Sequence, residues 1–249
     1  MYLEIQNLTL IYDRAIVLNE ASFQVELKEL VGMVGPNGAG KSSLLRAVSG
    51  LVTWEQKTLK GTVRGKITLT GSVKFADEEI LGWPAHKIAR KGLILCPERG
   101  RPFREMTVKE NLLAGAYCYS DKKLILGSLE KIYSLFPVLK RREKQYSGTL
   151  SGGERTMLSI GRSLMSQAKL LLIDEPSVGL APMVKEDLFA RIRDIHEMGI
   201  TILMTEQDVS FAFDLATRNY VLSRGKVIAE GTGAKLLEDE IIRKTYLGL

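Results

Sequence analysis

Residues 35–42 read Gly35-Pro36-Asn37-Gly38-Ala39-Gly40-Lys41-Ser42, the most informative segment of the sequence. It fits the pattern G-x-x-x-x-G-K-[ST] at every defined position. The apolar segment LVGMVG (30–35) runs into it like a short strand, and KSSLLRAVSGL (41–51) follows with apolar residues at helical spacing. A phosphate-binding loop lies between a strand and a helix in this way, so the sequence predicts such a loop here.

The predicted loop would hold the phosphates of a nucleotide. Its glycines let successive backbone N–H groups turn toward the β-phosphate, and the helix N-terminus adds a partial positive charge. Lys41 would reach the β and γ oxygens, and Ser42 would bind magnesium. The alternative is a glycine-rich turn that matches the pattern by accident. The predicted nucleotide contacts of this segment are Gly35, Pro36, Asn37, Gly38, Ala39, Gly40, Lys41, Ser42 and Ser43.

Two continuous apolar segments, KLLLID (169–174) and ITILMTE (200–206), flank a helical pattern around residues 182–198. This is the βαβ pattern of a buried parallel sheet. The first segment delivers Asp174 and Glu175 at its C-terminal end, where the ligands of parallel sheets bind. Asp174 would hold magnesium, directly or through water, and Glu175 would polarise the attacking water as a general base. Taken alone, Asp-Glu-Pro is equally compatible with a strand end and a turn.

The remaining segments indicate an α/β fold with two attachments. Alternating patterns at 2–12 and 21–27, and a hairpin-like pattern with glycine turns at 61–75, predict an antiparallel sheet near the N-terminus. Residues 85–165 contain several helical patterns and are interpreted as an inserted helical subdomain. We therefore expect a single domain, with a catalytic core and β subdomain in residues 1–84 and 166–249 and a helical subdomain in residues 85–165.

The segment Leu150-Ser151-Gly152-Gly153-Glu154 precedes a helical pattern. Ser151 and Glu154 have the S-x-x-E spacing of a capping box, which by itself explains both residues. A helix start with paired glycines and a serine hydroxyl is also a site for an anion. Because the segment lies well inside the helical region, the phosphate that Ser151, Gly152 and Gly153 would meet is expected to belong to another subunit.

Composition excludes several other classes of protein. No apolar run approaches the roughly 18 residues that a membrane-spanning helix needs, and no secretory signal is evident, so a cytosolic chain is expected. Cys96 and Cys118 stand far apart without a histidine cluster, which argues against a metal site or a disulfide framework. The formal charge of +6 is spread along the chain, which favours an ordinary mixed-charge surface over binding to nucleic acid.

Taken in order, these motifs resemble the nucleotide-binding domain of ABC transporters, a P-loop NTPase α/β fold with an antiparallel β subdomain and an inserted helical subdomain. The resemblance covers nearly the whole chain, with LSGGE as the family signature. It implies that Tyr12 stacks on adenine, although a strand-end tyrosine packed in the core is the alternative. Glu98 takes the loop position usually held by glutamine, as a contact of nucleotide and magnesium. Residues 177–181 match the loop after the base, and Gln207 takes the place of the switch histidine as a catalytic contact to the γ-phosphate.

The departures from the family pattern indicate one branch. Pro97-Glu98, Glu206-Gln207, the segment PSVGLAP and a C-terminal YLG are together similar to the LivF-type ATPases of branched-chain amino acid importers, a branch shared with urea importers. Lipopolysaccharide-exporter ATPases resemble the chain but keep the histidine. An additional strand around residues 54–64 departs from the branch pattern. His86 and His196 match none of the family's positions and are expected on the surface.

The resemblance implies ATP and Mg²⁺ as ligands, and a peripheral location on the cytoplasmic face of the membrane. It also implies a second, non-identical ABC ATPase subunit, two membrane permeases and an external solute-binding protein, with a homodimer possible in isolation. Contact with the permeases is expected at residues 98–103 and the helical region. Two rival functions remain: an ABC ATPase that acts on nucleic acid, and a regulatory module that binds nucleotide without hydrolysis. The missing coiled coil, second cassette and basic extension disfavour the first, and Glu175 disfavours the second.

Overall fold

The computed structural model describes residues 1–59 and 66–242 and contains two sheets. The four-stranded sheet has the order β2-β1-β4-β5, and its neighbouring strands are antiparallel. The six-stranded sheet has the order β10-β9-β3-β8-β7-β6, and only its β9–β10 pair is antiparallel. The strands are β1 (Leu3–Tyr12), β2 (Ala15–Val25), β3 (Leu30–Val34), β4 (Ile67–Phe75), β5 (Glu78–Glu79), β6 (Leu93–Cys96), β7 (Leu170–Asp174), β8 (Thr201–Glu206), β9 (Arg218–Ser223) and β10 (Lys226–Gly231).

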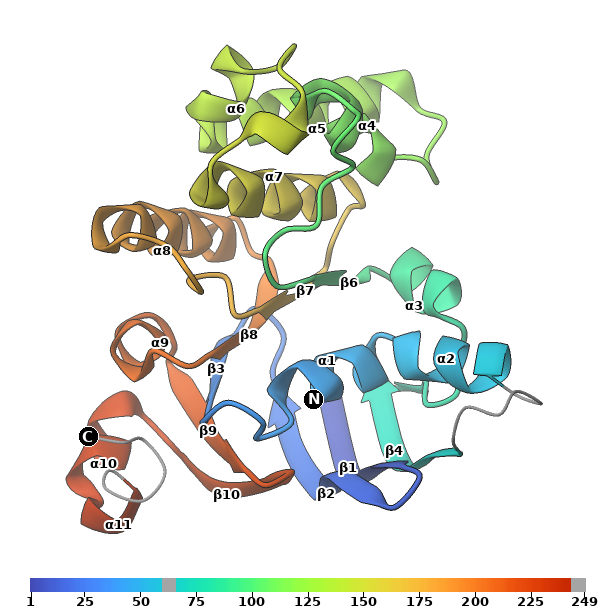
Figure 1. Cartoon of the computed structure of the whole chain (residues 1–249), viewed down its shortest axis with the longest axis vertical. Helices are drawn as coiled ribbons and strands as arrows, with labels where there is room; N and C mark the ends of the chain where they lie inside the picture. The colour runs from blue at the N-terminus through green and yellow to red at the C-terminus, as the bar shows by residue number, and fades with distance from the viewer. Residues whose placement is uncertain (60–65, 243–249) are drawn as a thin grey trace.

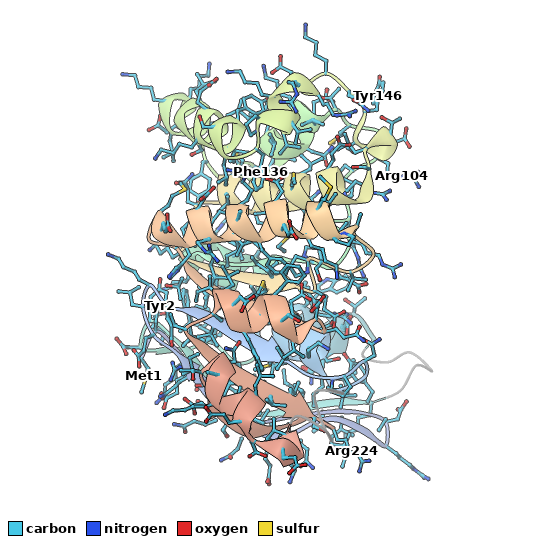
Figure 2. All side chains as sticks on the ribbon, turned by 90° about the vertical axis from the view of Figure 1, so that its left-hand side faces the viewer. Met1, Tyr2, Arg104, Phe136, Tyr146 and Arg224 are labelled. Carbon is cyan, nitrogen blue, oxygen red and sulfur yellow. The ribbon has the colours of Figure 1, made fainter. Side chains whose placement is uncertain are left out.

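Helices cover both sheets (Figure 1), with α4, α5, α6 and α7 gathered at one end of the molecule and α1 beside the antiparallel sheet. Figure 2 shows Phe136, Arg104 and Tyr146 at the helical end, opposite Met1, Tyr2 and Arg224. Among the described residues, no helix combines the length and apolar character needed to cross a bilayer. The helices are α1 (Lys41–Val48), α2 (Leu51–Leu59), α3 (Ala85–Lys91), α4 (Val108–Gly115), α5 (Lys122–Leu135), α6 (Pro137–Arg141), the 3₁₀ turn η1 (Ser147–Thr149), α7 (Gly152–Met165), α8 (Pro182–Glu197), α9 (Val209–Leu215), α10 (Gly233–Glu238) and α11 (Glu240–Ile242).

The strands β3, β7 and β8 of the six-stranded sheet are buried on both faces, whereas its edge strand β10 is partly exposed. Along β7, Leu171 and Ile173 pack with the helical region, whereas Leu170 and Leu172 pack with α1 and the antiparallel sheet. Side chains of a strand alternate between its faces, so a continuous apolar segment fills two cores at once. The strands β3, β8, β7 and β6 run parallel to one another. Their carboxyl-terminal residues therefore lie at the same edge of the sheet.

Two local predictions are wrong. The predicted extra strand at 54–64 is helix α2 as far as residue 59, and residues 60–65 lie outside the described part of the chain. Its buried Val52 and Thr53 lie on one side while Trp54 is exposed, which is the one-sided burial of a helix. Of the hairpin-like pattern at 61–75, residues 61–65 lie outside the described part of the chain, and residues 67–75 form the single strand β4, which pairs with β1 from Leu3↔Phe75 to Tyr12↔Ile67.

Gly71 explains the second error. Its φ is +116°, and a Cβ there would lie 2.7 Å from the carbonyl oxygen of Asn7. The residue occupies an irregularity where the β1–β4 register shifts, so glycine marks a bulge within one strand and not a turn between two strands.

Candidate functional site

The phosphate loop joins the end of β3 to the start of α1, as the motif predicts. A Cβ on Gly35 would lie 2.1 Å from the carbonyl oxygen of Leu222, and Gly40 has a φ of +108°. Any larger residue at Gly35 would collide with the backbone of β9, and an L side chain at Gly40 would be strained. The glycines therefore let the loop turn tightly at the carboxyl edge of the sheet.

Lys41 points back into its own loop. Its Nζ donates to the carbonyl oxygens of Gly35 at 2.7 Å and Pro36 at 3.2 Å, and lies 2.9 Å from Oε1 of Glu175. The side chain is 3% exposed. An ammonium group has three donors, and here all three are satisfied, because two carbonyls and one carboxylate surround it.

Ser42 and Asp174 form the second contact between the loop and β7. The Ser42 hydroxyl donates to Oδ1 of Asp174 at 3.0 Å, and the Thr205 hydroxyl donates to the same oxygen at 2.9 Å. Burial raises the pKa of Asp174, the two hydroxyl bonds lower it, and the negative charges of Glu175 and Glu98 raise it further. Glu98 therefore acts on the pKa of Asp174 through its charge, although the Glu98 carboxylate pairs with Nε of Arg99 at 3.1 Å.

Glu175 has a backbone conformation that non-glycine residues seldom adopt, with a φ of +41°. Its backbone N–H donates to the carbonyl oxygen of Thr205 at 3.1 Å and to the Thr205 hydroxyl at 3.2 Å. Neighbouring β8 thus fixes the turn that directs the Glu175 carboxylate toward Lys41. Strain of this kind occurs at functional sites, where the surrounding structure holds it.

The predicted capping box is confirmed at the start of α7. The Ser151 hydroxyl accepts from the backbone N–H of Glu154 at 3.3 Å, and Glu154 accepts from the backbone N–H of Ser151 at 2.9 Å. Gly153 lies against α8, where a Cβ would come within 2.4 Å of Cγ1 of Val184. Ser151 is exposed, so its hydroxyl faces solvent at a helix N-terminus. Its predicted contact with another subunit's phosphate remains a prediction.

Tyr12 has a neighbour that the sequence did not suggest. Its hydroxyl donates to Oε2 of Glu55 in α2 at 3.1 Å, and Glu55 also pairs with Arg46 in α1. The ring packs partly buried against the core of the antiparallel sheet. A half-buried ring is compatible with both the predicted stacking on adenine and the core alternative, so the stacking role stays a prediction.

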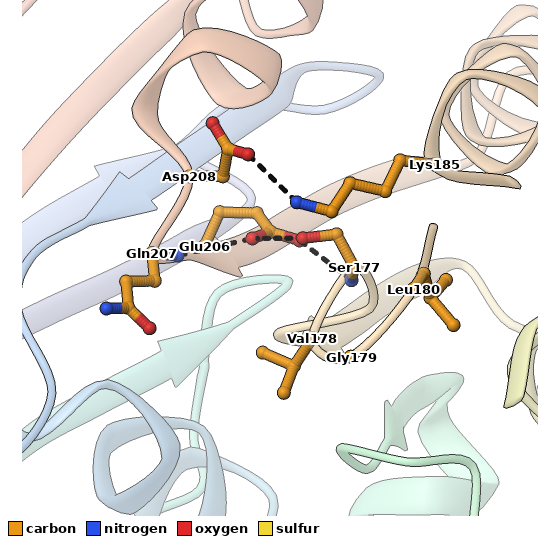
Figure 3. A pocket seen from close by; sticks show the side chains of 8 residues that line it. All are labelled: Ser177, Val178, Gly179, Leu180, Lys185, Glu206, Gln207 and Asp208. Atoms are coloured by element: carbon orange, nitrogen blue, oxygen red, sulfur yellow. Dashed lines mark hydrogen bonds and ion pairs between the residues drawn. The ribbon is translucent and has the colours of Figure 1, made fainter. Parts of the chain in front are cut away.

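Gln207 follows β8 and is exposed. Figure 3 shows its side chain pointing away from Ser177 and Lys185. In the described part of the chain, no recorded contact joins the side chain of Gln207, Glu98 or Tyr12 to Lys41 or Ser42. The structure thus brings Lys41, Ser42, Asp174 and Glu175 into contact.

Thr205 and Glu206 are site residues that the sequence reasoning missed as individual side chains. Both are fully buried at the end of β8, and Thr205 contacts Asp174 and Glu175 directly. The signal in the sequence that could have predicted them is a polar pair, Thr205-Glu206, at the end of an apolar strand. Glu206 lines a cleft of about 400 Å³ together with Ser177, Val178, Gly179, Leu180, Lys185, Gln207 and Asp208 (Figure 3).

The histidines and cysteines lie apart from these contacts. His86 is exposed as predicted, whereas His196 is half-buried, with Nδ1 3.3 Å from the carbonyl oxygen of Ile200. Both cysteines are free, and burial raises the pKa of the Cys96 thiol to about 11. Cys96 is therefore a reduced core thiol of low reactivity.

The fold and the site together define a P-loop nucleotide-binding protein. Residues 18–178 match the family model described as ABC transporter, and the chain belongs to this family. It is similar to the high-affinity branched-chain amino acid transport ATP-binding protein BraG of Pseudomonas aeruginosa, with 40% identity over 95% of each chain. It is also similar to the probable branched-chain amino acid transport ATP-binding protein LivF of Archaeoglobus fulgidus, with 33% identity over 96% of this chain and 95% of the relative.

The chain is also similar to an exporter ATPase and to a solved ATP-binding cassette. The lipopolysaccharide export system ATP-binding protein LptB of Haemophilus influenzae is 33% identical over 98% of this chain and 95% of its own length. A solved ATP-binding cassette of an ABC transporter in its ADP conformation has a TM-score of 0.81 and 25% identity, over 98% of this chain and 97% of that one. The predicted fold and the predicted LivF-type branch are confirmed, and the chain is an ABC ATPase.

Proposed function

We propose that this chain is the ATP-binding and ATP-hydrolysing subunit that powers an ABC importer of branched-chain amino acids. The observation that carries the ATPase half is the four-residue contact of Lys41, Ser42, Asp174 and Glu175. The similarity to BraG, at 40% identity over nearly the full length of both chains, supports the substrate half.

Lys41 and Glu175 change partners when ATP binds. The γ- and β-phosphates bring more negative charge to the loop than the Glu175 carboxylate does, so the ammonium group turns from Glu175 to the phosphate oxygens. Glu175 is then a carboxylate without its cation at the edge where a water molecule would attack. The backbone N–H of Glu175 donates to the carbonyl and hydroxyl oxygens of Thr205, which holds the turn in place. The freed carboxylate at this turn can then accept the proton of that water as a general base.

The residues present fit a magnesium ion. Ser42 and Asp174 supply a hydroxyl and a carboxylate oxygen 3.0 Å apart, and Mg²⁺ prefers oxygen ligands with few protein donors. Glu98 would add a third oxygen from the loop after β6. When bound with ATP, the ion would neutralise charge on the phosphates.

A second ATPase subunit, expected to be a different chain, would complete the site with its own signature segment. Ser151, Gly152 and Gly153 of this chain would do the same for the partner's nucleotide, because they offer a hydroxyl and backbone N–H groups at an exposed helix start. We further propose that the complex lies on the cytoplasmic face of the membrane with two permeases and an external solute-binding protein.

Residues 98–103 form the proposed contact with the permeases. Phe103 is 52% exposed, and Arg162 of α7 holds the loop by donating to the carbonyl oxygens of Gly100 at 3.2 Å and Arg101 at 3.1 Å. A permease that moves this loop would therefore also move α7 through Arg162, and α7 begins with the signature segment.

Solute uptake tests the proposal. Cells lacking this gene should lose uptake of labelled leucine and regain it with the wild-type chain or with Lys74→Ala, a change of an exposed lysine on β4. The Lys41→Ala chain should not restore it. If cells without the gene lose urea uptake but keep normal leucine uptake, urea is the solute instead. If they keep uptake of both solutes, the chain powers neither a branched-chain amino acid importer nor a urea importer.

A further inference from the structure

Glu206 is a buried carboxyl group that the proposed mechanism does not use. It ends β8 and is 0% exposed. Its Oε1 accepts from the backbone N–H of Ser177 at 3.1 Å, and its Oε2 accepts from the Ser177 hydroxyl at 2.9 Å and the backbone N–H of Gln207 at 3.2 Å. The backbone N–H of Asp208 is a further donor.

These hydrogen bonds connect two segments that leave the site in different directions. Ser177 lies near the start of the loop that follows Glu175, defined here as the 176–181 loop, and Gln207 begins the turn after β8. Ser177 lies 29 residues before Glu206 in the sequence, and Gln207 lies one residue after it. A single side chain therefore fixes the backbone on both sides of the cleft shown in Figure 3.

The chemistry of the contact suits a carboxylate. The surrounding groups are donors, and a carboxylate can accept from all of them because each of its oxygens has two lone pairs. A glutamine would offer one acceptor oxygen and place an NH₂ group opposite donors. Bonds to an ionised acceptor are also stronger than neutral ones.

A second, more exposed link crosses the same cleft. Nζ of Lys185 in α8 lies 3.0 Å from Oδ2 of Asp208, and 5.6 Å from the centre of the Phe211 ring. This ion pair joins the start of α8, just beyond the 176–181 loop, to the turn after β8. With the buried contact at Glu206, it makes the loop and the turn one connected unit.

We infer that Glu206 is a positioning residue that sets the 176–181 loop and Gln207 in register with each other, so that the residue expected at the γ-phosphate and the loop beside the base move together. The inference rests on the proposed function, and it adds a residue that touches neither nucleotide nor magnesium. The simpler alternative is a buried glutamate that only satisfies local backbone donors and affects stability alone.

The test compares Glu206→Gln, Ser177→Ala and their double variant in the full-length chain. The matched control is Glu29→Gln, a glutamate that accepts from the backbone N–H of Glu26 at 2.7 Å and pairs with Arg218, at the opposite end of β3 from the phosphate loop. Hydrogen exchange of the amides at Ser177 and Gln207 is measured first, and steady-state ATP hydrolysis second.

Glu206→Gln is expected to raise exchange at both amides and to lower kcat on the order of 10- to 100-fold, with KM changed by about two-fold or less, because misplaced groups reduce turnover more than binding. Ser177→Ala should have a smaller effect since its N–H bond remains. The double variant should be no worse than Glu206→Gln alone, as expected for residues acting through one contact.

Unchanged exchange and kcat in a folded Glu206→Gln chain would overturn the inference, and so would faster exchange with wild-type kcat, which is the result of a purely structural role. If the wild-type chain binds ATP but never hydrolyses it, the proposed function fails, while the exchange measurement still decides whether Glu206 links the two segments.

Discussion

Nζ of Lys41 lies 2.9 Å from Oε1 of Glu175, so the cation of the phosphate loop is paired with the proposed catalytic base. The two residues belong to different elements, α1 and the turn after β7, and both are largely buried. In the proposed mechanism, phosphate and base therefore compete for one ammonium group. This proposed competition would link nucleotide binding to the release of Glu175 for proton transfer.

Lys41→Ala is expected to abolish tight ATP binding, because the β- and γ-phosphates lose their main side-chain cation. It also leaves Glu175 as a largely buried carboxylate without its partner, so the variant should unfold at a lower temperature than wild type. Calorimetric titration with ATP measures the affinity. Wild-type affinity in a folded variant would remove the phosphate-loop assignment, and Lys74→Ala provides the control for loss of one positive charge.

Gln207→Ala is expected to lower kcat by on the order of 10- to 10³-fold with a smaller change in KM, as removal of one transition-state hydrogen-bond donor does. The exposed amide can donate to a γ-oxygen, but it cannot take up a proton near neutral pH. Turnover is compared for wild type, Gln207→Ala and Gln207→His, each assembled with the partner ATPase. A wild-type rate for Gln207→Ala would show that Gln207 has no catalytic role. The partner's site would then be the better candidate for most of the turnover.

The stability of the chain should depend on pH through Glu206. Burial outweighs the hydrogen bonds from Ser177, Gln207 and Asp208 and raises the pKa of Glu206 to about 7 from an ordinary 4.5. The surrounding donors reduce the cost of ionising Glu206 in the folded chain but do not offset its burial, so the stability that this group contributes is complete below pH 4.5 and is lost as the pH rises through about 7.

Glu206→Gln cannot ionise, so its melting temperature should rise relative to wild type between pH 5.5 and pH 8.5, by roughly 2–8 °C. Lys185 and Asp208, the charged groups that share the cleft, are present in both chains, so their contributions cancel in the difference. Thermal unfolding of the two chains in matched buffers gives the measurement. A difference that stays constant across this range would show that Glu206 does not titrate there.

The phosphate loop and the Asp174-Glu175 pair could be predicted because their chemistry is encoded locally. Each is a short motif at the end of an apolar strand, and parallel strands bring such ends to one edge of the sheet. The contact of Lys41 with Glu175 could not be predicted in the same way. It depends on the packing of α1 against β7 and on the unusual backbone of Glu175.

Glu206 and α2 show where sequence patterns fail. At the end of an apolar strand, a glutamate is usually a solvated residue, and only the fold of the 176–181 loop over it makes Glu206 a buried acceptor. The segment at 54–64 was expected to be a strand, but its described part, up to residue 59, belongs to helix α2. Contacts of Glu55 with Tyr12 and Arg46 join it to neighbouring elements as a helix.

The rate of ATP hydrolysis by Glu175→Gln, measured in the complex with the partner ATPase and the permeases, decides whether Glu175 is the base. The amide keeps the size of the side chain but cannot accept the proton of the attacking water, and it no longer competes with phosphate for Lys41. ATP affinity should therefore equal or exceed that of wild type, while turnover falls on the order of 10²–10⁴-fold and ATP stays bound between the subunits. Turnover near the wild-type rate, with binding intact, would contradict the assignment of Glu175 as the base and with it the proposed exchange of partners at Lys41.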